Sequence, residues 1–119
     1  MLTFEKVTDE TKLVVEEMFS SYDLPVRDVA YCIKADDTYI GIIDYTVQHE
    51  KALLSYLLIH HDYEGYGYGT NAYYTFEEIV KNEHMKEIQI ICMDKNERIE
   101  SFLGQLGFQK NNDVYIKKL

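Results

Sequence analysis

The order of hydrophobic and polar residues along the chain predicts short strands that alternate with helices. Runs rich in β-branched and aromatic residues and bounded by polar turns are typical of strands. Such runs occupy residues 2–7, 29–34, 39–47, 52–59, 87–92, 108–110 and 114–118. The turns at 35–37 and 48–51 are short, so we expect the second, third and fourth strands to be antiparallel neighbours.

Three other segments show the spacing of a helix with one apolar face. The first follows Thr8, which is suited to cap a helix, and it ends before Pro25, because proline cannot continue a helix. The second covers residues 70–82, and the third covers 96–106 with Gly107 placed as a left-handed cap. The residues expected to face inward are Leu13, Val14, Met18, Phe19, Ala72, Tyr73, Phe76, Ile79, Val80, Ile99, Phe102, Leu103 and Leu106.

The succession of these elements predicts a fold class. Strand 52–59, a glycine-rich turn, helix 70–82 and strand 87–92 are typical of a right-handed βαβ unit, whose two strands are parallel. The last two strands form a hairpin around residues 111–113. We therefore expect one domain, residues 1–119, with an α/β (α+β) fold: a mixed, largely antiparallel sheet of about six to seven strands flanked by helices.

Charge limits the classes of partner. The 119 residues carry 12 basic and 21 acidic side chains, a net charge of −9. This charge repels phosphate backbones, so we expect no nucleic-acid partner, and a cationic amine is a better match. The alternative is that the acidity serves only solubility.

The two cysteines and the N-terminus indicate a compartment. Cys32 and Cys92 both lie in strand-like runs, which favours buried thiols over a disulfide or a metal pair, so we expect no metal site. No run approaches eighteen uncharged apolar residues, and the start lacks the features of a signal peptide. We expect a cytoplasmic protein without a membrane partner.

The most informative stretch joins the fourth strand to the second helix. Gly65, Gly67 and Gly69 alternate there with larger residues. Glycine lets a backbone approach a ligand closely, and the N-terminus of the following helix offers unpaired N–H groups suited to phosphate. The spacing lacks the third glycine of a dinucleotide fingerprint.

Two sequence motifs, the glycine-rich segment and one further along the chain, together resemble those of a known family. The segment from Glu64 to Thr70, Glu-Gly-Tyr-Gly-Tyr-Gly-Thr, resembles the pyrophosphate loop of the GNAT superfamily of acyl-CoA-dependent N-acetyltransferases. Asn96, followed by Leu-Gly-Phe at 106–108, resembles the ending of the same family. The resemblance covers nearly the whole chain and implies a sheet splayed between its fourth and fifth strands.

The resemblance also implies a donor and the residues that bind it. The donor is acetyl-CoA, whose pantetheine arm pairs with the fourth strand while the loop amides hold the pyrophosphate. The implied cofactor-binding residues are Leu57, Leu58, Ile59, Gly65, Tyr66, Gly67, Tyr68, Gly69, Thr70 and Asn96. The acceptor is an amine on a small molecule or a peptide.

The chain departs from the family pattern at its charged and catalytic positions. Glu64 replaces a usual Arg or Gln, and Tyr66 stands where a basic residue is common. Leu53 occupies the position of a glutamate base, and Leu103 that of a tyrosine acid. Some relatives, including histone-type acetyltransferases, also lack the tyrosine.

A replacement base can be sought near the ends of the fourth strand, where His49, Glu50, His60 and Asp62 occur. A histidine titrates near neutral pH and could take the amine proton directly or through water, so His60 is our candidate catalytic residue. The alternative is that His60 and His61 only fill turn positions.

These observations leave three functions open. The first is acetyl transfer from acetyl-CoA to a primary amine in a ternary complex. The second is a module that binds acyl-CoA or a protein partner as a sensor without turnover, and the third is a purely structural domain. The segment after the first helix is short for the family, so the acceptor site is either open or completed by a second copy in a homodimer.

Overall fold

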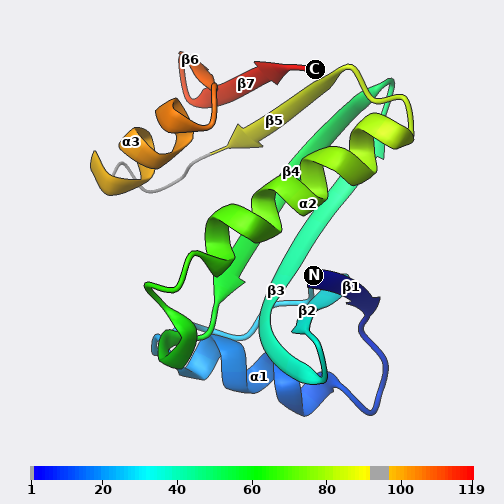
Figure 1. Ribbon diagram of the computed structural model, residues 1–119, viewed down its shortest axis with the longest axis vertical. Helices are drawn as coiled ribbons and strands as arrows, with labels where there is room; N and C mark the ends of the chain where they lie inside the picture. The colour runs from blue at the N-terminus through cyan, green and yellow to red at the C-terminus, as the bar shows by residue number, and fades with distance from the viewer. Residues whose placement is uncertain (1, 92–96) are drawn as a thin grey trace.

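A computed structural model describes residues 2–91 and 97–119 (Figure 1). The strands are β1 (Leu2–Lys6), β2 (Tyr31–Ala35), β3 (Thr38–Gln48), β4 (Lys51–Ile59), β5 (Glu87–Ile91), β6 (Gln109–Asn111) and β7 (Val114–Lys118). The helices are α1 (Lys12–Ser20), α2 (Tyr68–Asn82) and α3 (Glu97–Gln105), and a 3₁₀ turn, η1, covers His61–Tyr63. The predictions for Cys92 and Asn96 fall outside the described residues.

The described strands form a 7-stranded sheet in the order β1-β2-β3-β4-β5-β7-β6. Among these described strands, β4 and β5 alone pair in parallel, and the other neighbours are antiparallel. The β3–β4 hairpin turns through His49 and Glu50, both with left-handed φ values of 52° and 63°. The predicted mixed, largely antiparallel α/β (α+β) fold with one parallel pair is confirmed.

Helices α1 and α2 cover opposite faces of this sheet. Cys32 and Ile42 pack in the α1 cluster, whereas their chain neighbours Ile33 and Ile43 pack in the α2 cluster. Consecutive residues of a strand point to opposite faces, so the two helices lie on either side. The buried side chains that α1 and α2 contribute to these clusters are Val15, Met18, Phe19, Ala72, Tyr73, Phe76 and Val80.

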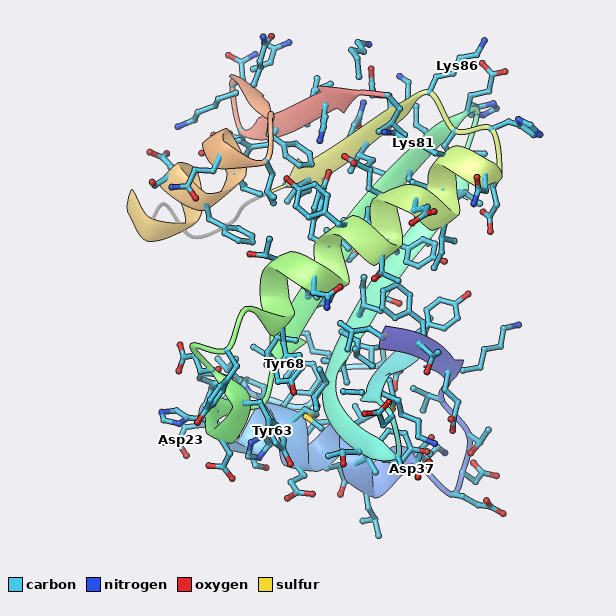
Figure 2. The ribbon with its side chains drawn as sticks, viewed as in Figure 1. Asp23, Asp37, Tyr63, Tyr68, Lys81 and Lys86 are labelled. Atoms are coloured by element: carbon cyan, nitrogen blue, oxygen red, sulfur yellow. The ribbon has the colours of Figure 1, made fainter. Side chains whose placement is uncertain are left out.

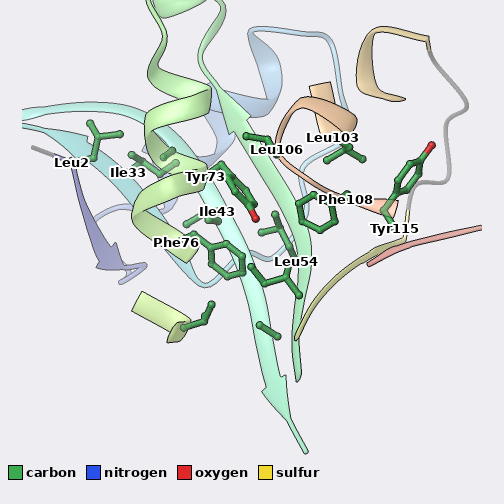
Figure 3. Packing of buried hydrophobic residues seen from close by; sticks show 14 of the residues in the cluster. Leu2, Ile33, Ile43, Leu54, Tyr73, Phe76, Leu103, Leu106, Phe108 and Tyr115 are labelled. Carbon is green, nitrogen blue, oxygen red and sulfur yellow. The ribbon is translucent and has the colours of Figure 1, made fainter. Parts of the chain in front are cut away.

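The larger cluster joins α2 to the C-terminal elements (Figure 3). The ring of Tyr73 lies 5.7 Å from the ring of Phe108 and 6.2 Å from that of Phe76, centroid to centroid. Leu103 and Leu106 bring α3 into the same cluster. Gly107 then ends α3 with a φ of 94°, as predicted.

The predicted inward face of α1 is wrong at Leu13, which is 74% exposed, while Val15 is buried. The helix begins only at Lys12, and the N–H of Thr8 donates to the hydroxyl of Thr11 instead of Thr8 capping the helix. Residues three and four positions apart share a helix face. A face that contains residues 18 and 19 therefore includes 15 and excludes 13.

Helix α2 begins at Tyr68, two residues before the predicted start, and its inward face carries an unpredicted charge. The Glu77 side chain is only 9% exposed. It accepts a hydrogen bond from the Tyr73 hydroxyl at 2.9 Å and an ion-paired bond from the Lys117 ammonium at 2.5 Å. An unpaired buried carboxylate would be costly, so this contact ties α2 to β7.

Candidate functional site

The parallel pairing of β4 with β5 stops halfway along β4. It runs from Lys51 opposite Glu87 to Leu54 opposite Ile90. Beyond this point β4 continues to Ile59, and Figure 1 shows the two strands diverging. We call the unpaired side of residues 55–59 the open edge of β4. The open edge confirms the splay that the family resemblance implies between the fourth and fifth strands.

A β-bulge marks the start of the open edge. Tyr56 pairs with Asp44 and Leu54 pairs with Tyr45, so Ser55 has no partner on β3. A bulge bends its strand and increases the local twist. Strand β4 therefore turns away from β5 at the point where the bulge lies.

Leu57 and Ile59 direct their backbone N–H and C=O groups into the open edge. The N–H of His60 donates to the carbonyl of Ile40 at 2.8 Å, and Ile59 lies opposite Gly41. This combination makes Ile59 and Gly41 a non-hydrogen-bonded pair of the ladder. The direction of the backbone N–H and C=O groups alternates along a strand. Leu57 therefore points these groups the same way as Ile59, while Leu58 points its groups toward β3. An extended amide-bearing chain could pair with these free groups.

The side chain of Tyr22 binds one of these backbone groups, the carbonyl of Ile59. Its hydroxyl donates to the carbonyl of Ile59 at 2.7 Å, and its ring lies 5.5 Å from the ring of His61. Burial and, secondarily, the carboxylate of Glu64 raise the pKa of Tyr22, so the phenol keeps its proton. The end of α1 is thereby fixed against the end of β4, and the free donors that remain are the N–H groups of Leu57 and Ile59.

The glycine turn has the conformation that its composition predicts. Gly65 and Gly67 have φ values of 87° and 82°, a region that other residues adopt at a cost. Gly67 is the N-cap of α2, and its carbonyl accepts the first helical bond from the N–H of Asn71 at 3.1 Å. The N–H groups of Tyr68, Gly69 and Thr70 then have no partner within the helix, as in an anion site.

This helix start lies against the end of the open edge. A Cβ placed on Gly69 would be 3.9 Å from Cγ1 of Ile59, an ordinary contact. Figure 2 shows Tyr63 and Tyr68 next to each other at this end of α2, and their rings are 6.4 Å apart. Tyr66 points outward and is 76% exposed. The start of α2 therefore lies beside Ile59, the last residue of the open edge.

The described part of the chain offers no ion-paired cation at the glycine turn, and Arg27 lies instead over the ring of Tyr56, with 5.9 Å from Cζ to the ring centroid. No lysine or arginine among residues 2–91 and 100–119 forms an ion pair with Glu64. Figure 2 places Lys81 and Lys86 toward the other end of α2. Anion binding here would rest on backbone N–H groups, which keep their polarity whatever side chains surround them.

The two apolar replacements sit on the expected elements. Leu53 is half-buried in β4, opposite Thr46 on β3 and Gln89 on β5. Leu103 is buried in the core with Leu106. Neither position offers a group that can move a proton.

The structure separates the histidine and carboxylate candidates. His49 and Glu50 lie in the β3–β4 turn, and the carboxylate of Glu50 pairs with Lys86 at 3.3 Å, at the far end of β4. His60 instead follows the open edge directly, and its side chain is 13% exposed. Its Nδ1 accepts the N–H of Asp62 at 3.0 Å. The Nδ1 lone pair is therefore occupied in this arrangement.

Two residues beside the site were not predicted from the sequence. Besides the Tyr22 contact, the Ser21 hydroxyl accepts the N–H of His61 at 3.3 Å. Both contacts join residues about 40 positions apart at the exit of β4. No local pattern marks them, because they simply follow the end of a helix.

Within the residues that the structure describes, no group of three or more His, Cys, Asp or Glu side chains is placed to hold a metal ion. In the same part of the chain, no helix is both long and apolar enough to cross a membrane.

Solved structures with the same fold are numerous. An acetyltransferase from Thermus thermophilus superposes with a TM-score of 0.81 at 18% identity, over 100% of this chain and 97% of that one. The PaiA N-acetyltransferase from Thermoplasma acidophilum, in complex with coenzyme A, gives 0.75 at 18% identity, over 100% and 99%. The ribosomal-protein-S18-alanine N-acetyltransferase from Escherichia coli gives 0.74 at 12%, over 100% and 93%.

At these identities the structural likeness shows the fold alone. A comparison with curated protein sequences finds no match. The model of the acetyltransferase (GNAT) family, however, matches residues 3–108, which is most of the chain. The open edge, the glycine turn and this match lead to one conclusion: the chain belongs to the GNAT family of acetyltransferases.

Proposed function

We propose that the chain transfers an acetyl group from acetyl-CoA to a primary amine by direct attack in a ternary complex. The observation that carries the proposal is the open edge of β4, which runs into the free N–H groups at the start of α2. An acyl-CoA has two matching parts, an extended amide-bearing arm and a pyrophosphate. Membership of the GNAT family supports acetyl as the group transferred.

Each implied binding residue has a definite part in this proposal. Leu57 and Ile59 offer N–H groups to the arm, and Leu58 supports them by bonding to β3. Residues 65–70 hold the pyrophosphate through the amides of the turn and of the first helical turn. Asn96 is carried over from the family as a further hydrogen-bonding residue.

Bound acetyl-CoA would supply a thioester whose carbonyl carbon is attacked by the amine, so that a C–N bond forms and the C–S bond breaks. The chain contributes position first, which alone can lower a barrier by several kcal/mol. A free N–H of the open edge can also donate to the carbonyl oxygen as it gains negative charge. The thiolate can leave without an acid at Leu103, because thiols have pKa values near 8.5.

The attacking amine must lose a proton, and Leu53 offers no base. We keep His60 as the candidate acceptor, acting through water, because it is the first residue beyond the open edge. To take the proton at Nδ1, the imidazole must release the N–H of Asp62. A His60→Asn variant separates this role from a structural one, since an asparagine oxygen lies close to the position of Nδ1 and can still accept that N–H but cannot act as a base. We expect a lower kcat with unchanged affinity for the coenzyme.

The second candidate function is a module that binds acyl-CoA without turnover. Leu53 and Leu103, which cannot move protons, and Glu64, whose charge opposes the pyrophosphate, favour it. Calorimetry and thermal shift with acetyl-CoA come first: both functions require binding, and no heat or shift at millimolar coenzyme would contradict both. Release of free thiol with a panel of primary amines then separates them, because only the transferase gives amine-dependent release.

A further inference from the structure

Ile59 lies where the two parts of the proposed coenzyme site meet. It is the last residue of the open edge, and a Cβ on Gly69, in the first turn of α2, would lie 3.9 Å from its Cγ1. The Tyr22 hydroxyl donates to the carbonyl of Ile59 at 2.7 Å. A ligand that reaches from the glycine turn to the open edge therefore has to pass the phenol of Tyr22.

A chain that pairs with Ile59 needs this carbonyl. A residue that faces an added strand uses both its N–H and its C=O in the ladder. The partner nitrogen then lies about 2.7–3.2 Å from the carbonyl oxygen, a range that the phenolic oxygen already occupies. A carbonyl can accept from two directions, but two donor atoms cannot share the ladder position. The phenol must turn aside before an extended arm completes its pairing.

The phenol can turn aside without disturbing α1. The backbone N–H of Tyr22 donates to the carbonyl of Phe19 at 3.1 Å, and the N–H of Leu24 donates to the same carbonyl at 3.0 Å. These bonds hold the backbone at the end of α1 whatever the side chain does. Residues 23–28 are exposed, so the chain beyond Tyr22 is not packed into the core.

The protonation of Tyr22 favours control by a ligand over control by pH. Burial and, secondarily, the carboxylate of Glu64 raise the pKa of the phenol. The hydroxyl therefore remains a donor near neutral pH and keeps its bond to Ile59. A competing N–H at the carbonyl is what can release it.

We propose that Tyr22 is a latch on the open edge: its hydroxyl holds the carbonyl of Ile59 in the free protein and turns aside when the arm of acetyl-CoA binds. This inference rests on the proposed function. The latch lowers the affinity for the coenzyme, because binding must break a hydrogen bond within the protein. Without the hydroxyl, water takes its place on the carbonyl, so the difference is the net value of one intramolecular hydrogen bond, about twofold to tenfold in affinity.

The test compares Tyr22→Phe with Tyr39→Phe by calorimetry with acetyl-CoA. Each variant loses one phenolic hydrogen bond, but the Tyr39 hydroxyl donates at 2.8 Å to Glu5 on β1, on the other side of β3 from the open edge. ADP is the second ligand, because it carries a pyrophosphate and no arm. NMR of isotope-labelled tyrosine follows the ring of Tyr22 in the parent, and its signal is identified by its loss in Tyr22→Phe. Thermal melting checks that each variant folds.

We expect Tyr22→Phe to tighten acetyl-CoA about twofold to tenfold and Tyr39→Phe to leave it unchanged, with ADP unaffected by either. The Tyr22 ring signal should shift with acetyl-CoA and stay in place with ADP. Unchanged or weaker binding of acetyl-CoA by Tyr22→Phe, or an equal gain for ADP, would overturn the latch. If neither the parent nor the variant binds acetyl-CoA, the latch and the proposed function both fail. A gain in affinity without amine-dependent thiol release keeps the latch and contradicts only the transferase.

Discussion

Replacement of Gly41 by alanine should displace the open edge of β4 from the side that pairs with β3. Gly41 lies on β3 directly opposite Ile59. A Cβ at this position would be 2.3 Å from the carbonyl oxygen of Leu58 and 3.2 Å from Cα of Ile59. Both neighbours are backbone atoms, which cannot rotate away. The strands must separate by about 1 Å to restore an ordinary contact, which moves the residues that form the open edge.

The expected cost of Gly41→Ala is about 3 kcal/mol of unfolding free energy, the upper range for overpacking a tight site. For a chain of this size that lowers the melting temperature by about 10 °C. Gly104→Ala is the control, because Gly104 lies on an exposed position of α3 with nothing within 4 Å of an added Cβ. Alanine there should stabilise by about 0.5–1 kcal/mol. Denaturant unfolding measures both, and equal stability of the Gly41 variant and the parent would refute the reasoning.

Three further predictions concern the glycine turn and the buried ion pair. Gly67→Ala should lower the free energy of unfolding by about 1–2 kcal/mol, since the φ of 82° at this position is left-handed. No atom within 4 Å opposes the added methyl group, so the cost is backbone strain. An unchanged midpoint of denaturant unfolding would exclude this strain. Glu64→Lys should tighten the binding of acetyl-CoA about threefold to tenfold in calorimetry, because it reverses a charge near the pyrophosphate. Asp37→Lys, in the distant β2–β3 turn, should leave this affinity unchanged. Equal effects of the two variants would mean that only net charge matters. Burial raises the pKa of Glu77, but the Lys117 ammonium and the Tyr73 hydroxyl outweigh it and hold that pKa below its usual value. The stability gained is therefore present above the ordinary carboxyl pKa and is lost as pH falls through the lowered one, and Glu77→Gln should flatten this acid limb of an unfolding–pH profile.

The main features of the fold could be predicted because they depend on local sequence. Strands 39–47 and 52–59 are rich in β-branched and aromatic residues, and the short turn between them permits only a hairpin. Gly65 and Gly67 adopt the positive φ values for which glycine is suited. The splay followed from the family resemblance, because the bulge at Ser55 that accompanies it leaves no mark in the composition of β4.

The features that could not be predicted are contacts between distant segments. Tyr22 reaches Ile59 across 37 positions, and nothing near Tyr22 in the sequence indicates a partner. Glu77 interrupts the apolar face of α2 and is tolerated only because Lys117 arrives from β7. The sequence predicts Leu13 inward because helical spacing alone does not fix where a face begins, and the observed helix starts later than expected.

The central claim is that the open edge of β4 receives the arm of acetyl-CoA, and amide hydrogen exchange tests it most directly. In the free protein the N–H groups of Leu57 and Ile59 have no strand partner and should exchange quickly, whereas that of Leu58 bonds to β3 and should exchange slowly. Saturating acetyl-CoA should protect Leu57 and Ile59 and leave Leu58 nearly unchanged. Bound coenzyme without new protection at Leu57 and Ile59 would contradict the account.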